Sequence, residues 1–423
     1  MEKCITVLEK SLLPIANKVS NNRYLKAISS GSMSLLGIIM VGAIFSVFGN
    51  ISWQPYNQFL NTYHLDIVIA FVPAVTTELL AIYMAFTVAY HGASCFENKE
   101  YAMSSGLLSL VSFMLLVPMD STSLEGITFY NVQYLGTRGV FVAIVTGLIT
   151  AKLLSVIMRK NIRIKMPEGA PPMVSESFSS LIAGTIVVVL FIIIKVVFSM
   201  TEYGTFNDFI YLIIQTPLQA ITGSLPAFIL CLVLAQLLWF FGVHGSMTVL
   251  PMLLPIWLSF IGDNTSALAA GEAIVHPLNI GMYDLACLGG AGATIGLVIL
   301  MAFGAKSKQY QQLGKITFPC GVFGVNEPVI FGLPMILNPL MAIPFILCPI
   351  IIVLIGYALI QLGIVTAPIG IFGLGSMPPF ISGVMQGSVS WGVYQLVAVV
   401  ISILVYYPFF KIIDKQALIK EMG

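Results

Sequence analysis

The chain has 423 residues, of which 58% are hydrophobic and 9% are charged. Soluble globular domains carry about 25% charged residues, so this composition predicts an all-α polytopic membrane protein and excludes a soluble domain of any size. The net charge of +1 argues against a nucleic-acid partner. Six cysteines without a CxxC pair argue against a disulfide framework or a zinc site. The sequence has no GxxxxGK[ST] nucleotide loop, and we expect no cofactor and no metal.

The first half of the chain predicts five membrane crossings. Residues 1–26 mix basic and apolar residues, which indicates an amphipathic surface helix and not a cleaved signal peptide. Residues 204–222 carry polar side chains beside apolar ones at helical spacing, which is typical of an arm in the membrane interface. The apolar stretches between these segments are long enough, at about 17 to 25 residues, to cross a bilayer: 27–49, 67–90, 102–118, 139–158 and 178–200.

The second half predicts five more crossings, for about ten transmembrane helices in total: 223–243, 246–262, 283–304, 340–362 and 389–410. With both termini in the cytoplasm, all basic residues except Arg138, Lys152 and Lys195 fall on the cytoplasmic side, as the positive-inside rule requires. With this orientation the chain must enter and leave residues 318–338 on the cytoplasmic side, so this segment is predicted to be a re-entrant hairpin entered from the cytoplasm. Residues 264–281 form either a second hairpin or a plain loop, and 363–388 are not assigned.

Glu327 is the only charged residue or histidine in residues 316–410. A charge near the centre of a bilayer costs about 2.5 to 3.5 kcal/mol on insertion scales, so such a group usually faces a water-filled cavity or a partner. Pro328 and Gly332 interrupt the helix, and irregular backbone is tolerated in a membrane where it lines a cavity. Asn326 adds an amide, which suits a ligand rich in hydroxyl groups. The alternative is that Glu327 pairs with a buried donor and only stabilises the fold.

His244 is the only charged residue or histidine in residues 209–262. Counting the crossings from a cytoplasmic amino terminus places His244 at the cytoplasmic end of the sixth crossing. This is also the side from which the Glu327 hairpin enters. We therefore expect both residues to line one inward-facing cavity, as binding groups and as the catalytic pair. The alternative is a helix-end imidazole whose flanking residues, Gly242 and Gly245, are present for backbone reasons.

Four motifs in order resemble enzyme IIC, the membrane component of the sugar phosphotransferase system, in its lactose and cellobiose family: Gly242-Val243-His244-Gly245, the glycine cluster 289–294, Asn326 to Pro334 with Asn338-Pro339, and Tyr406 to Lys411. The similarity covers most of the chain and is densest from residue 223 onward. It implies an amino-terminal, dimer-forming half over 1–222 and a sugar-binding transport domain with two hairpins over 223–423.

The resemblance also implies a substrate and a reaction. A β-linked disaccharide of the cellobiose, lactose or chitobiose type is expected to bind with its C6 hydroxyl near His244 and Glu327, with Asn326 and Gly245 as further contacts. Trp239 either stacks on the sugar or anchors the helix at the membrane boundary. The phosphoryl group would come from a phosphocysteine on a separate enzyme IIB, supplied by enzyme IIA and the general phosphotransfer proteins. The chain would then be a transport component and not a self-sufficient kinase.

The sequence leaves the sugar specificity and the mechanism open. Related cellobiose-type members place a stacking Trp just before a Thr-Met-Pro-Pro segment, where this chain has Gly375 before Ser-Met-Pro-Pro, so the particular sugar is not fixed. Glu327 and His244 could instead form the relay of a proton-coupled secondary sugar transporter. A membrane hydrolase is disfavoured, because no nucleophile or metal set accompanies the pair.

Overall fold

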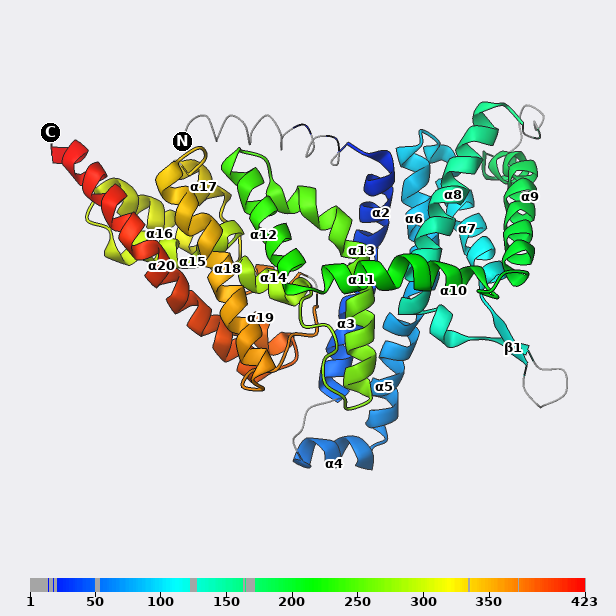
Figure 1. Cartoon of the computed structure of the whole chain (residues 1–423), viewed down its shortest axis with the longest axis horizontal. Helices are drawn as coiled ribbons and strands as arrows, with labels where there is room; N and C mark the ends of the chain where they lie inside the picture. The colour runs from blue at the N-terminus through cyan, green and yellow to red at the C-terminus, as the bar shows by residue number, and fades with distance from the viewer. Residues whose placement is uncertain are drawn as a thin grey trace. The chain divides into compact units, whose positions relative to one another are not determined.

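The computed structural model describes residues 21–49, 54–121, 128–162, 172–333, 335–371 and 373–422, together with Pro14, Lys18 and Ile164. Most of the surface helix expected within residues 1–26 lies outside these ranges, as does Pro334. Over the described ranges the chain is helical apart from loops and one antiparallel hairpin of β1 (Met119–Ser121) and β2 (Thr128–Tyr130) (Figure 1). The all-α polytopic class is confirmed.

The chain divides into two compact units. We call Val19–Ile221 with Pro251–Gly271 the first unit, and Thr222–Leu250 with Glu272–Gly423 the second unit. The helix α13 (Gly245–Ala269) therefore contributes residues to both. Each unit has its own buried core, and each contains one of the two polar cavities described below.

The first unit is a bundle built around α6, which contacts α2, α7 and α8. Small residues bring these helices close, since a side-chain carbon at Gly31 of α2 or Gly147 of α8 would lie 2.8 or 3.0 Å from Val88 of α6. Ser109 of α7 donates a hydrogen bond of 2.7 Å to the carbonyl of Ala85. Such close approaches and interhelical hydrogen bonds hold helices together in lipid. The elements in order are α2 (Arg23–Ser34), α3 (Leu36–Gly49), α4 (Gln54–Thr62), α5 (Leu65–Val75), η1 (Thr77–Leu79), α6 (Leu80–Cys95), η2 (Lys99–Tyr101), α7 (Ala102–Leu116), the β-hairpin, η3 (Val132–Tyr134), η4 (Thr137–Gly139), α8 (Val140–Arg159), α9 (Pro172–Ser199), α10 (Phe206–Ile210), η5 (Tyr211–Gln215) and α11 (Thr216–Thr222).

The second unit is made of long helices and short broken ones. The long helices α18 and α20 contact each other, and α20 also contacts α15 and α19. The elements in order are α12 (Leu225–Phe240), the start of α13, α14 (Ile280–Ala286), η6 (Ala291–Ala293), α15 (Ile295–Ile299), η7 (Leu300–Gly304), α16 (Lys308–Val322), α17 (Glu327–Gly332), α18 (Pro339–Gln361), η8 (Leu374–Ser376), α19 (Ile381–Met385) and α20 (Val389–Met422).

The expected crossing 283–304 is broken in the structure. Its two helical parts are bent by 45° where three glycines adopt positive φ, which side chains with a Cβ rarely do: Gly289, Gly290 and Gly292. The freed carbonyls find partners on α20, because Tyr406 donates to the carbonyl of Gly292 at 2.8 Å and Ser402 donates to that of Ala293 at 2.6 Å. The glycine cluster is thus a fixed loop inside the second unit.

The number of membrane crossings depends on how such bent pairs are counted. Six helices of the described chain are long and apolar enough to cross a membrane, or up to nine if each of three bent pairs crosses once. About ten were expected. The difference arises partly because helices are shorter than the apolar stretches: α7 has 15 residues within 102–118, and α12 has 16 within 223–243. The expected arm 204–222 is helical as α10, η5 and α11.

Where the sequence predicts a hairpin at 318–338, α16 and α17 form a helix–turn–helix. Gly324, with φ of 77°, makes the turn, and the Val325 N–H donates to the Cys320 carbonyl at 3.0 Å. The turn leads directly into Glu327 at the start of α17. The local chain path therefore presents the carboxylate at the tip of a broken helix pair.

Candidate functional site

A cavity of about 250 Å³ lies entirely within the second unit and contains both ionisable residues singled out by the sequence. Its walls come from the end of α12, the start of α13, α14, the glycine cluster, the start of α17 and the loop around η8. Broken helices thus supply most of the lining. The polar and aromatic lining residues are Trp239, His244, Ser246, Tyr283, Asp284, Asn326, Glu327 and Ser376.

His244 is positioned by the turn between α12 and α13. Gly242, with φ of 79°, closes α12, and its N–H donates to the carbonyl of Trp239 at 2.9 Å. The His244 Nδ1 accepts a hydrogen bond of 3.2 Å from the Met247 N–H. A ring nitrogen that accepts carries no proton, so the neutral imidazole carries its proton on Nε2. This tautomer presents an N–H donor to the cavity.

Glu327 faces that donor. The distance from Nε2 of His244 to Oε1 of Glu327 is 3.9 Å, which is longer than a hydrogen bond and leaves both groups able to contact a ligand. The side chains are 40% and 46% exposed, so neither is sealed against the protein. Burial lowers the pKa of His244 from its ordinary value, and the nearby Glu327 carboxylate raises it by less. The imidazole is therefore mainly neutral at pH 7.

Asn326 holds Glu327 in place. Its Nδ2 donates to the carbonyl of Ala291 at 2.7 Å and to the Thr294 hydroxyl at 2.8 Å, and the residue is 3% exposed. A side chain at Gly290 would collide with Asn326 at 2.2 Å, so only glycine allows this approach. The amide lines the cavity while both its protons bind the glycine cluster. The geometry supports a positioning role beside the predicted contact with a ligand.

Trp239 and Gly245 help to position His244. The Trp239 ring lies 4.3 Å from the imidazole at 45°, is 5% exposed, and has no partner for its Nε1 among the described residues. Gly245 begins α13, and a Cβ there would lie 1.8 Å from the carbonyl oxygen of Ala235. The glycine thus allows α13 to pack closely on α12. Both residues fix the place of the imidazole.

The sequence did not single out several lining groups. Tyr283 donates to the Ser246 hydroxyl at 2.9 Å, and Asp284 accepts from the Gly375 N–H at 3.1 Å. Asp284 lies inside α14, which begins at Ile280, and its carboxylate binds the η8 loop. A side chain at Gly375 would lie 2.8 Å from Asp284. The isolated carboxylate in an apolar stretch was the signal that could have identified Asp284.

Fold and site together define a polytopic helical membrane protein whose broken helices surround a half-exposed acid and imidazole, an arrangement typical of membrane transporters. Residues 29–349 match the model of the family described as "Phosphotransferase system, EIIC". The chain belongs to this family.

Several relatives are similar over nearly their whole length. The lichenan permease IIC component of Bacillus subtilis (strain 168) is 32% identical over all of this chain and 96% of its own. The cellobiose-specific EIIC component of Geobacillus stearothermophilus is 33% identical over all of this chain and 97% of its own. The crystal structure of the transporter ChbC, the IIC component from the N,N'-diacetylchitobiose-specific phosphotransferase system, superposes with a TM-score of 0.92 at 32% identity, covering 99% of each chain.

Proposed function

We propose that the chain is the sugar-specific permease, enzyme IIC, of a phosphoenolpyruvate-dependent phosphotransferase system, and that it takes up a β-linked disaccharide of the cellobiose or chitobiose type. One observation carries the proposal: an imidazole N–H donor and a carboxylate 3.9 Å apart, both half-exposed, in a polar cavity. A hydroxyl group placed between them receives one hydrogen bond and donates the other. The relatives named for cellobiose and diacetylchitobiose support the substrate class.

The cavity volume fits one sugar ring. Pockets that enclose drug-sized ligands measure about 300 to 1,000 Å³, and this one measures about 250 Å³. We infer that the ring to be phosphorylated is enclosed and that the second ring reaches toward the opening. Position 375 is a glycine whose N–H binds Asp284, so this position offers the sugar no aromatic ring. Selection between sugars would then rest on the polar lining, including Tyr283 and Asp284.

The pair can also support phosphoryl transfer from a separate phospho-enzyme IIB to the C6 hydroxyl. Nε2–H of His244 donates to the hydroxyl oxygen and orients it, while Glu327 accepts the hydroxyl proton. As the new O–P bond forms, the S–P bond of the phosphocysteine breaks and its electron pair returns to sulfur. The product carries about −1.5 to −2 charges at pH 7 and is repelled once Glu327 loses its proton again.

The assembly and orientation belong to the same proposal. We infer that residues 1–222 form a homodimer interface, that 223–423 form the transport domain except for Pro251–Gly271, which belong to the first unit, and that both termini face the cytoplasm. The distribution of basic residues supports this orientation through the positive-inside rule. In this orientation His244 and Glu327 would be accessible to the soluble phosphotransfer proteins.

Uptake of radiolabelled cellobiose and diacetylchitobiose into membrane vesicles tests the function. We expect accumulation as sugar phosphate, dependent on phosphoenolpyruvate, enzyme IIA and enzyme IIB, and insensitive to an uncoupler. Accumulation of unmodified sugar that collapses when the uncoupler is added would instead establish a proton-coupled transporter and contradict the proposal.

A further inference from the structure

A second polar cavity lies entirely within the first unit and has no part in the site described above. It measures about 410 Å³, within the range of ligand pockets. Four separate segments line it: η1, the turns η3 and η4, the arm formed by η5 and α11, and the part of α13 after Pro251. The polar side chains that matter below are Glu78, Arg138, Gln215, Gln219 and Asp263.

The arm formed by η5 and α11 has a polar face that lines the cavity. Tyr211, Gln215 and Gln219 are spaced four residues apart and all line the cavity. Apolar residues of the same arm are exposed, with Leu212 at 51% and Ile221 at 61%. An arm at a membrane surface exposes apolar residues to lipid, so its polar stripe needs polar partners inside the protein. The stripe also begins in η5, a π-helical turn, and such turns occur frequently at functional sites.

Gln215 has an unsatisfied group. The residue is 1% exposed, and its Nε2 donates to the carbonyl of Thr137 at 3.0 Å. Its Oε1 is buried without a hydrogen-bond partner among the described residues. A buried, unpaired acceptor costs about 1 to 3 kcal/mol. Because Gln215 lines the cavity, a small rotation of its side chain would bring this oxygen to a ligand that donates a hydrogen bond, which would remove that cost.

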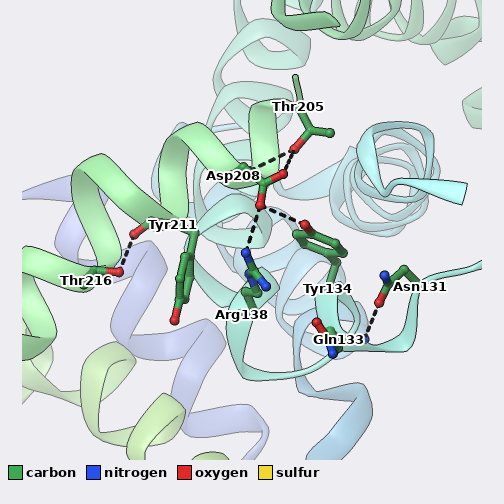
Figure 2. A network of polar contacts seen from close by, with 8 residues as sticks. All are labelled: Asn131, Gln133, Tyr134, Arg138, Thr205, Asp208, Tyr211 and Thr216. Atoms are coloured by element: carbon green, nitrogen blue, oxygen red, sulfur yellow. Dashed lines mark hydrogen bonds and ion pairs between the residues drawn. The ribbon is translucent and has the colours of Figure 1, made fainter. Parts of the chain in front are cut away.

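Among the described residues that line the cavity only Arg138 is positively charged, and it is paired with the carboxylate of Asp208. Arg138 donates to Oδ1 of Asp208 at 3.0 Å, and the same oxygen accepts from Tyr134 at 2.8 Å (Figure 2). The Arg138 guanidinium also lies over the ring of Tyr211, 4.5 Å from its centroid. Thr205 donates to the second oxygen of Asp208 at 2.7 Å. This network fixes the arginine as part of the wall and leaves no free positive charge to attract an anion.

The remaining charges are negative. Glu78 lines the cavity, and so does Asp263, which accepts from the Thr137 hydroxyl at 2.7 Å. Carboxylates and amide oxygens accept hydrogen bonds, and amide nitrogens donate them, which suits a ligand with several hydroxyl groups. The negative lining repels phosphate esters. No group of three or more metal-binding side chains occurs in the described part of the chain, so a metal ion is not favoured.

We propose that this cavity is a second carbohydrate site, which takes a neutral mono- or disaccharide and excludes the phosphorylated form. Gln215 and the two carboxylates bind hydroxyl groups, and Arg138 with Tyr211 forms the wall against the ring. Neither His244 nor Glu327 lines this cavity, so this site can fail while the proposed function stands, and the reverse also holds.

Equilibrium binding to the full chain in lipid nanodiscs, without phosphotransfer proteins, tests the proposal. The probes are radiolabelled cellobiose, diacetylchitobiose and glucose. We expect at least one probe to bind wild type at two sites per chain, and the His244→Ala, Glu327→Gln double variant to weaken one of these sites and leave the other unchanged. A single site in wild type that the double variant weakens, for all three probes, would overturn the proposal. Stronger binding of the polycation spermidine, used as a competitor, than of every sugar would also overturn it.

Further substitutions in the double variant locate the residual site. Gln215→Leu is expected to weaken residual binding about tenfold or more, while Gln58→Ala, an exposed glutamine of α4, leaves it unchanged. Glu78→Gln with Asp263→Asn should allow cellobiose 6-phosphate to compete with the bound sugar. A folding defect cannot produce this gain. The assignment would be refuted if Gln215→Leu bound the sugar as tightly as before. It would also be refuted if cellobiose 6-phosphate competed equally well before and after the two carboxylates are replaced.

Discussion

Replacing Glu327 with Gln separates the two tasks proposed for this residue. The amide is nearly the same size and can still bind a hydroxyl group, but it cannot accept a proton. His244 is mainly neutral, so no ion pair is lost with the carboxylate charge. The loss in sugar binding is then the difference between a charge-assisted and a neutral hydrogen bond, about 1 kcal/mol or roughly fivefold.

The loss in phosphorylation should be much larger. General base catalysis contributes about 10²- to 10⁴-fold, so sugar-phosphate formation in Glu327→Gln should fall by at least about 100-fold while the dissociation constant changes roughly fivefold. The assay measures radiolabelled sugar phosphate formed from purified phospho-enzyme IIB under single-turnover conditions, beside equilibrium binding of the same sugar. Glu327→Asp, which keeps the carboxylate but shortens its reach, is the matched control and should retain more activity. A fall in phosphorylation no larger than the fall in binding would refute the base role.

Three further predictions concern the residues around the acid. His244→Ala removes the Nε2–H donor and should weaken sugar binding about tenfold in equilibrium measurements; wild-type affinity would remove the residue from the site. Asn326→Ala leaves the carbonyl of Ala291 and the hydroxyl of Thr294 without their donor, at a cost of about 2 kcal/mol in stability. The midpoint of thermal unfolding should therefore fall, whereas Asn61→Ala on the exposed face of α4 should leave it unchanged. Because the pKa of His244 is lowered on folding, its contribution to stability is complete above pH about 6.5 and declines as the pH falls toward the folded-state pKa. Thermal unfolding midpoints measured between pH 5 and 8 should therefore fall toward low pH in wild type and fall less in His244→Gln. Identical pH profiles of the two proteins would contradict this prediction.

The sequence predicted the residues of the site better than their contacts. Solitary charges in apolar stretches are costly, and for this reason we predicted His244 and Glu327 as neighbours, which the structure places 3.9 Å apart. It could not show that the two protons of the Asn326 amide bind the glycine cluster, because that contact joins segments 32 to 35 residues apart. Whether a polar side chain serves the ligand or the fold is decided by such contacts.

The fold was predicted in class and less well in detail. Hydropathy identified apolar stretches, but it does not record where a helix stops or bends. The break at the glycine cluster 289–294 depends on positive φ angles and on hydroxyl donors from α20, a helix more than 100 residues away. The polar cavity of the first unit was also missed, because Glu78, Gln215 and Asp263 come from distant segments that each look unremarkable in the sequence.

A structure of the chain with its transported disaccharide tests the central claim most directly. The account predicts one sugar ring in the cavity of the second unit, with the C6 hydroxyl within about 3.2 Å of both Nε2 of His244 and a carboxylate oxygen of Glu327. A sugar bound with that hydroxyl turned away from the pair, or a second-unit cavity that stays empty at saturating sugar, would contradict it.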